Sequence, residues 1–244
     1  MKPCAFAGQS LSSHIEGCLA VFKSFAEKNE NYFEVASRRL RSALKDTTVP
    51  PERLEEIARL AILFHDVGKA YNKFQARFDD NCSQVKEGGF QYHEVASAAM
   101  CYKFLNSQGD AWSMVEKALL ALSILNHHHA SRNSIKMMSE RESDAKAKVL
   151  KLVESGFCEG DLQPVFGRFN INLRGLVLRG SDVESFHSWL NGLRQAQKAG
   201  RWMKLYILVM YPLIVADNLE ARRRGGMNEM RKMFVKEIEE VVFC

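Results

Sequence analysis

The chain has 244 residues, of which 46% are apolar and 26% charged, and its formal net charge is +5. This length allows one large domain or two small ones, and the ordinary apolar fraction excludes a disordered or fibrous protein. The mild basic excess is compatible with a polyanionic partner. Much of it falls between Pro164 and Lys204, where seven basic residues face two acidic ones. A solvated helical face is the alternative explanation for that segment.

The apolar segments and the cysteines predict a soluble protein of the cytoplasm. The N-terminal residues lack the continuous apolar core of a signal peptide. The most apolar stretch, residues 205–216, contains Pro212 and is shorter than the roughly 20 residues that a membrane-spanning helix needs. The six cysteines form no CxxC pair, and their even spacing favours buried or free thiols over disulfides.

Helical periodicity predicts an all-α fold in one domain, residues 1–244. Helices are expected at residues 15–28, 54–66, 94–105, 115–126 and 200–224. Ser12 or Ser13 is the expected cap of the first helix, Gly68 the expected stop of the second, and Pro212 an expected kink in the last. A less regular insert is expected at about residues 155–180, in which residues 170–178 are the best candidate for a short strand.

Six of the seven histidines lie at or beside the ends of predicted helices. These are His14, His65, His93, His127, His128 and His129. A single histidine on an apolar helix is usually a structural residue, so the argument depends on the whole set and on its acidic neighbours.

Two aspartates end apolar runs. Asp66 follows His65 and the apolar residues 61–64, and Asp217 follows the apolar residues 213–216. Burying an ionised carboxylate costs several kcal/mol unless a cation or hydrogen bonds compensate it. Imidazoles arriving from other helices beside two such acids favour a transition-metal cation between them.

The number of ligands is sufficient for two metal ions. His14, His65, Asp66 and Asp217 would fill most of one site. His93 and two of the residues His127–His129 would fill a second if Asp66 bridges. Two neighbouring divalent ions are a common device for phosphodiester hydrolysis.

The ordered motifs resemble those of the HD superfamily. They are His14, HDVGK at 65–69, KFQ at 73–75, FQYHE at 90–94, the doublet within HHH at 127–129, and VADNLEA at 215–221. Within the superfamily, the set resembles the CRISPR-associated HD nucleases, the stand-alone nuclease subunits of type I interference systems. The resemblance spans residues 14–221 and implies an HD-domain helical bundle with the metal site at its centre.

Each matching residue acquires an expected role from this resemblance. One ion would be held by His14, His65, Asp66 and Asp217, and a second by Asp66, His93, His127 and His128. The HHH run offers two registers, and His127–His128 is preferred because the family pattern continues with one variable and one small residue. Asp66 and Lys69 are the expected catalytic residues. Lys69 would face the scissile phosphate and offset transition-state charge, or else cap a helix C-terminus.

The resemblance implies a nuclease that cleaves single-stranded DNA in CRISPR interference with two divalent transition-metal ions (Mn, Ni, Co or Fe). Arg222, Arg223 and Arg224 are candidate nucleic-acid contacts. The family works beside a superfamily 2 helicase, which must be a separate chain here because Leu63 replaces the first glycine that a phosphate loop ending at Gly68-Lys69 would need. An RNA-guided effector complex would select the target.

Two other functions fit parts of the pattern. An HD phosphohydrolase acting on nucleotides or cyclic nucleotides would not need the second histidine pair. A catalytically idle subunit that binds the effector complex through its basic C-terminal half would not need the intact set of acids.

The segment between Lys69 and His93 is rich in aromatic residues. Phe74 and Phe78 are expected to plug the bundle. The alternative is a flap whose rings stack on unpaired bases, and Tyr71 and Tyr92 fit either arrangement.

Overall fold

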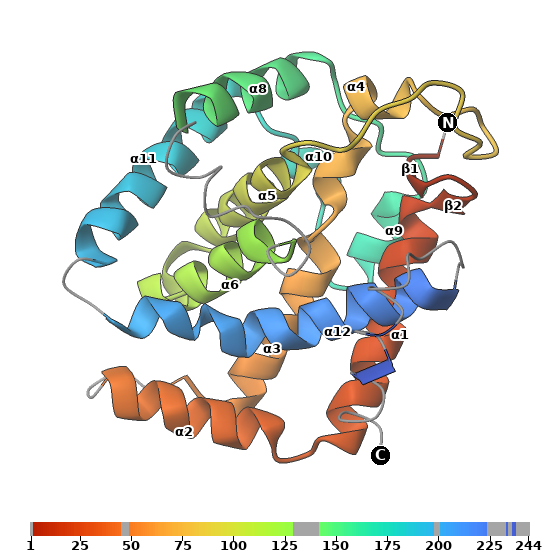
Figure 1. Ribbon diagram of the computed structural model, residues 1–244. Helices are drawn as coiled ribbons and strands as arrows, with labels where there is room; N and C mark the ends of the chain where they lie inside the picture. The colour runs from red at the N-terminus through yellow and green to blue at the C-terminus, as the bar shows by residue number, and fades with distance from the viewer. Residues whose placement is uncertain are drawn as a thin grey trace.

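The computed structural model describes residues 2–44, 49–128, 142–197, 201–223, 233 and 236–237. Most of these residues are helical, which confirms the all-α prediction (Figure 1). A short antiparallel hairpin, β1 (Cys4–Phe6) and β2 (Gln9–Ser10), leads into the first helix. None of the described helices is long and apolar enough to cross a membrane.

Eight of the helices in the described residues have thirteen residues or more. They are α1 (Leu11–Lys28), α2 (Tyr32–Leu44), α3 (Pro51–Phe64), α5 (His93–Ser107), α6 (Met114–Asn126), α8 (Glu142–Glu154), α11 (Gly180–Gln197) and α12 (Ile207–Arg223). The shorter elements are η1 (Val67–Ala70), α4 (Asn72–Gln75), η2 (Gly109–Ala111), α9 (Leu162–Gly167), α10 (Leu173–Leu176) and η3 (Arg201–Tyr206).

Helix α3 lies at the centre of the bundle. It packs against α1, α2, α5, α6 and α12, and α12 crosses it in Figure 1. Every residue from Leu60 to Phe64 is buried, as expected for a helix segment that is apolar all round. The end of α3 therefore places the next two residues, His65 and Asp66, inside the protein.

All five predicted helices are present, with differences at their ends. The cap of α1 is Ser10, whose hydroxyl accepts a hydrogen bond from the Ser13 amide, so the expected cap at Ser12 or Ser13 was wrong. Helix α3 ends at Phe64, before Gly68, which lies in η1. Pro212 lies inside α12, and the preceding turn, η3, is a separate element.

The predicted strand at residues 170–178 is wrong. Asn170 has a φ of 58°, which interrupts an extended run, and Leu173–Leu176 forms the short helix α10. Leu173 and Leu176 are both buried. Their three-residue spacing is helical, so their burial favours a helical turn over a strand.

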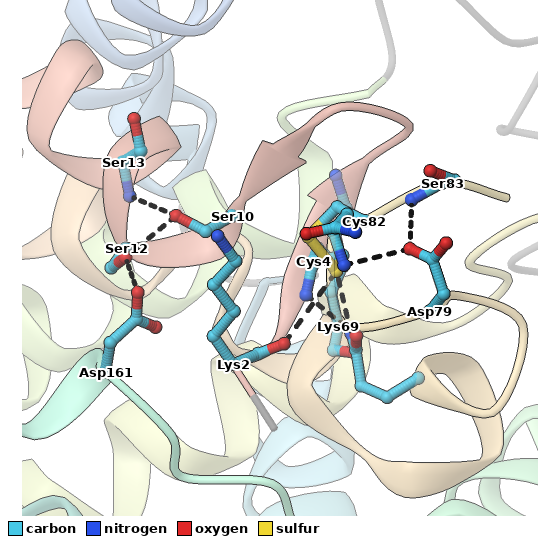
Figure 2. Close-up of a disulfide and its surroundings, with 12 residues drawn as sticks. Lys2, Cys4, Ser10, Ser12, Ser13, Lys69, Asp79, Cys82, Ser83 and Asp161 are labelled. Atoms are coloured by element: carbon cyan, nitrogen blue, oxygen red, sulfur yellow. Dashed lines mark hydrogen bonds between the residues drawn. A yellow bond between two sulfur atoms is a disulfide. The ribbon is translucent and has the colours of Figure 1, made fainter.

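A disulfide between Cys4 and Cys82 contradicts the expectation of free thiols alone (Figure 2). It joins β1 to the loop that follows α4, across 78 residues of sequence. The same loop accepts a hydrogen bond from the Gly8 amide at the Cys82 carbonyl, 2.8 Å away. Spacing could not predict the pair, because the hairpin and this loop meet only in the folded chain. Cys18 and Cys101 are buried free thiols.

Removing this disulfide is expected to destabilise the protein. Cys82→Ser should lower the free energy of unfolding by about 2–4 kcal/mol, because the cross-link closes a long loop in the unfolded chain. Urea unfolding with and without a reductant measures the effect. The reductant should destabilise the native chain but leave the variant unchanged. Equal stability of the native chain and the variant without reductant would contradict the expectation.

Four aromatic residues of the segment after Lys69 are buried. Phe74 packs in the main core, which confirms it as a plug of the bundle, and Tyr71 and Tyr92 pack there as well. Phe78 is buried in a separate cluster beside the disulfide rather than in the bundle. Side chains held in this way are not available to stack on bases.

Candidate metal centre

Three histidines at helix ends have their rings fixed by the backbone. His65 follows the last residue of α3, His127 follows the last residue of α6, and His93 is the first residue of α5. In each ring Nδ1 bonds the carbonyl oxygen three residues earlier, at Ile62, Ile124 and Phe90 respectively. A carbonyl only accepts, so Nδ1 carries the proton and Nε2 presents its lone pair inward. Helix C-termini supply such unused carbonyls, and this arrangement is typical of metal-binding histidines.

Asp66 lies at the point where these rings meet, and it is 1% exposed. Its Oδ2 atom is 3.2 Å from Nε2 of His14 and 3.4 Å from Nε2 of His65. Its Oδ1 atom is 2.9 Å from Nε2 of His93 and 3.8 Å from Nε2 of His127. The two carboxylate oxygens therefore face two different groups of imidazoles.

Helices α1 and α12 bring the remaining acid to the cluster. Oδ1 of Asp217, on α12, lies 3.4 Å from Nε2 of His14, on α1. The two helices pack closely at Gly17, where a Cβ atom would overlap the carboxyl group of Glu220. Glu220 is buried and accepts a hydrogen bond from Gln9. A larger residue at position 17 would have to displace the carboxyl group of Glu220.

A second close approach joins η1 to α5. The Gly68 amide donates to the Ser97 hydroxyl over 2.8 Å, and a Cβ at Gly68 would overlap the carbonyl oxygen of His93. This contact holds Asp66 beside His93. Nε2 of His128 lies 3.1 Å from Nε2 of His93 and completes this side of the cluster.

The structure brings together all seven side chains predicted as metal ligands. Together with Cys18 they form two groups, His14, Cys18, His65 and Asp217 in one, and Asp66, His93, His127 and His128 in the other. Within each group the candidate ligand atoms lie within 4.8 Å of one another. His129, the alternative member of the doublet, lies outside the described residues.

Cys18 is a member of the cluster that the sequence analysis missed. It is one helical turn after His14, and its Sγ atom is 3.7 Å from Nε2 of His14. The i, i+4 spacing of the two residues was the available signal. A cysteine on the apolar face of a helix is usually a core residue, so this spacing alone did not mark Cys18 as a ligand.

Lys69 is buried inside the cluster. It is 2% exposed, and its Nζ atom lies 2.6 Å from Oδ2 of Asp66. The ammonium therefore bonds a carboxylate rather than the carbonyls of a helix end, which was the alternative role considered for it. Arg222 and Arg223 are exposed on the last turn of α12, and Arg223 is 3.5 Å from Glu220. Arg224 lies outside the described residues.

Burial and charge set the protonation of the cluster. Burial lowers the pKa of His65 to about 4, and it also lowers the pKa of His128, as do the neighbouring imidazoles. Burial alone would raise the pKa of Asp66, but the charge of the Lys69 ammonium holds it well below its usual range. His65 and His128 are thus neutral beside an ionised carboxylate, which is the state that metal ligation requires.

The donor set fits a divalent transition metal. A neutral His93 that donates its Nδ1 proton to the Phe90 carbonyl has no second proton for Asp66, so two acceptor atoms then face each other at 2.9 Å. Oδ1 of Asp66 and Nε2 of His127 are buried without a hydrogen-bond partner. Unpaired buried acceptors are costly, and a cation bound between them would satisfy both.

A helical bundle with a His-Asp pair at the end of its central helix, and further histidines and an aspartate from the surrounding helices, defines the HD class of metal-site proteins. The sequence model of the family described as "Cas3, HD domain" matches residues 7–193. The chain belongs to this family, which confirms the resemblance inferred from its motifs.

Two comparisons with individual proteins agree with this assignment. The CRISPR-associated endonuclease Cas3-HD of Saccharolobus solfataricus is 29% identical over 228 residues, which cover 91% of this chain and 89% of that protein. The structure of the CRISPR-associated Cas3 HD domain protein of Methanocaldococcus jannaschii matches with a TM-score of 0.59 at 17% identity. That match covers 87% of this chain and 99% of the other, and it confirms the HD-domain fold.

Proposed function

We propose that this protein is a metal-dependent nuclease that hydrolyses phosphodiester bonds of single-stranded DNA in CRISPR interference. The observation that carries the proposal is the buried carboxylate of Asp66, which faces inward-pointing imidazoles with both of its oxygens. Membership of the Cas3 HD family and the similarity to a protein named as a CRISPR-associated endonuclease support it.

The cluster would hold two divalent ions. His14, His65 and Asp217 would bind one, His93, His127 and His128 the other, and Asp66 would be shared. Ions bound there lower the pKa of a water and neutralise negative charge on the phosphate under attack. The protein contributes imidazoles held at helix ends and a carboxylate that is excluded from solvent. Lys69 would lie toward the scissile phosphate and offset the charge that develops in the transition state.

The depth of the cluster favours a single strand. His14, His65, Asp66 and His93 are each no more than 1% exposed, so a substrate must reach into the bundle. A flexible single strand does this more easily than a rigid duplex. Arg222 and Arg223, which follow Asp217 on α12, would contact the backbone of the strand, together with Arg224.

The proposed partners are a separate superfamily 2 helicase and an RNA-guided effector complex in the cytoplasm. Gly68 and Lys69 lie in the helical turn η1 rather than in a phosphate loop. We take residues 1–244 as one HD nuclease domain. Target selection by guide pairing would leave this domain without a need to read bases.

A substrate comparison tests this proposal. Purified protein with Mn²⁺ should cut labelled single-stranded DNA at least about tenfold faster than blunt duplex, because the duplex is too rigid to reach the buried cluster. A tenfold preference corresponds to ~1.4 kcal/mol of difference in binding to the site. An Asp66→Asn protein prepared in parallel controls for contaminating nucleases. Equal cleavage of both DNAs would contradict the strand preference, and hydrolysis confined to mononucleotides would favour an HD phosphohydrolase.

The same substrate tests the proposed path of the strand. Binding should weaken with salt at a slope of about −0.7 per phosphate contacted, and Arg222→Gln with Arg223→Gln should reduce that slope without changing metal content. The matched control is Arg168→Gln with Arg174→Gln, which removes two exposed arginines of the basic 164–204 segment. If the salt slope fell only in the variant of Arg168 and Arg174, the strand would instead follow the 164–204 segment.

A further inference from the structure

The environment of Lys69 is unusual for a lysine. The side chain is 2% exposed, yet lysines are almost never fully buried unless they are paired. Its partner is Oδ2 of Asp66 at 2.6 Å. Its Nζ atom also lies over two aromatic rings, 3.9 Å from the centroid of Phe6 and 5.0 Å from that of Phe90. One carboxylate and two ring faces thus surround the ammonium group.

The structure around Lys69 holds this position firmly. The Gln75 amide donates to the carbonyl of Lys69 over 2.6 Å and to the carbonyl of Cys4 over 3.1 Å. The Cys4–Cys82 disulfide then ties β1, the strand that carries Phe6, to the loop after α4 (Figure 2). The strand that carries Phe6 and the turn that carries Lys69 are therefore held together.

The ammonium lies where a metal ion would need to bind. The oxygen that accepts the Lys69 bond, Oδ2 of Asp66, is the same atom that faces Nε2 of His14 and of His65. Two cations on one carboxylate oxygen repel each other strongly in a site removed from water. Binding of a metal by this group of ligands and the Lys69–Asp66 ion pair are therefore in competition.

We propose that Lys69 is the internal counter-ion of the metal centre. With no metal bound, its ammonium neutralises the buried Asp66 carboxylate and stabilises the fold. A divalent ion must displace it from Oδ2, so Lys69 lowers the affinity of the centre for metal. The inference rests on the proposed metal centre and adds to it a positioning residue that sets metal affinity, separate from any role of Lys69 at the phosphate.

Calorimetric titration and thermal melting of the full chain test the proposal. The variants are Lys69→Met, which removes the charge, and Lys69→Gln, which removes it but keeps an N–H donor for Asp66. After treatment with a chelator, both should melt at a lower temperature than the native protein. Both should then bind Mn²⁺ at least about tenfold more tightly, equivalent to ~1.4 kcal/mol.

Lys148→Met is the matched control. Lys148 also lies over an aromatic ring, 4.9 Å from that of Tyr92, and bonds the Tyr92 hydroxyl rather than a carboxylate of the cluster. Its loss should leave Mn²⁺ affinity unchanged. A purely structural role for Lys69 would not tighten metal binding, so affinity separates the two explanations.

Unchanged or weaker Mn²⁺ affinity in both Lys69 variants would overturn the proposal, as would unchanged melting of the chelated proteins. A Lys69→Met chain that folds only when Mn²⁺ is added would support it. Neither measurement uses nucleic acid, so failure of the proposed nuclease activity leaves both results interpretable. If the native protein bound no Mn²⁺, the proposed metal centre would fail, and melting would still test the ion pair.

Discussion

An Asp66→Asn variant is expected to lose DNA cleavage by more than about 100-fold, because loss of a residue that only supports a metal ligand commonly costs 10- to 100-fold. Asp66 points one carboxylate oxygen toward each group of imidazoles. An amide has the same shape but no negative charge, so it cannot offset the charge of two cations. Cleavage of labelled single-stranded DNA measures the loss.

Substitution of Asp66 by Asn, rather than by Ala, is expected to preserve the fold. Asp66→Ala would strand the buried ammonium of Lys69 without a partner, at a cost of several kcal/mol, whereas an amide oxygen still accepts its bond. Asp182→Asn is the control, because Asp182 pairs with Lys103 at 2.9 Å on another face of the bundle. A folded Asp66→Asn protein with near-native cleavage and metal content would remove Asp66 from the centre.

Removal of divalent metal is expected to abolish activity, and Mn, Co, Ni or Fe is expected to restore it. Mg²⁺ or Ca²⁺ at the same concentration should restore at least about tenfold less activity. Imidazole ligands favour transition metals, whereas Mg²⁺ and Ca²⁺ prefer oxygen ligands. The cluster contains five imidazoles and two carboxylates within the described residues, with the thiol of Cys18 beside His14.

Reconstitution of chelated protein with each metal in turn measures this preference, and the metal content of each sample shows whether the ion has bound. Circular dichroism of the chelated protein controls for loss of the fold. Full recovery of cleavage with Mg²⁺ alone would show that the histidines do not determine the metal.

Much of the site could be anticipated because its residues follow local rules. His65 and Asp66 come after a buried helix end, and His127 does the same after α6. A polar residue placed at the end of an apolar helix has little access to water, and its pairing can be expected from that position alone. Asp217 was found by the same reasoning, whereas His14 was found from the set of histidines and the resemblance to the family. Nothing local shows that α1 and α12 cross at these residues.

The features that were missed depend on contacts between distant segments. Cys4 and Cys82 are 78 residues apart, and only the docking of the hairpin on the loop brings them together. Helix α2 was missed for a different reason: it is polar on most of its surface, and it buries only a narrow stripe that includes Phe33, Ala36 and Leu40. Those residues do recur at helical spacing, so the signal was present but weak.

By itself, the sequence determined which residue types end the apolar helices, and therefore that buried imidazoles and carboxylates would need a cation. Helix periodicity and the burial cost of a charge act over a few residues, which is why both can be predicted from the chain alone. Only the tertiary structure decided how those groups are arranged around Asp66 and what lies next to it. The close approach of Gly68 to the backbone of α5 sets how η1 meets that helix, and the hairpin and disulfide enclose Lys69 beside Oδ2. These contacts join segments that are remote in sequence, and their geometry follows from packing the whole bundle.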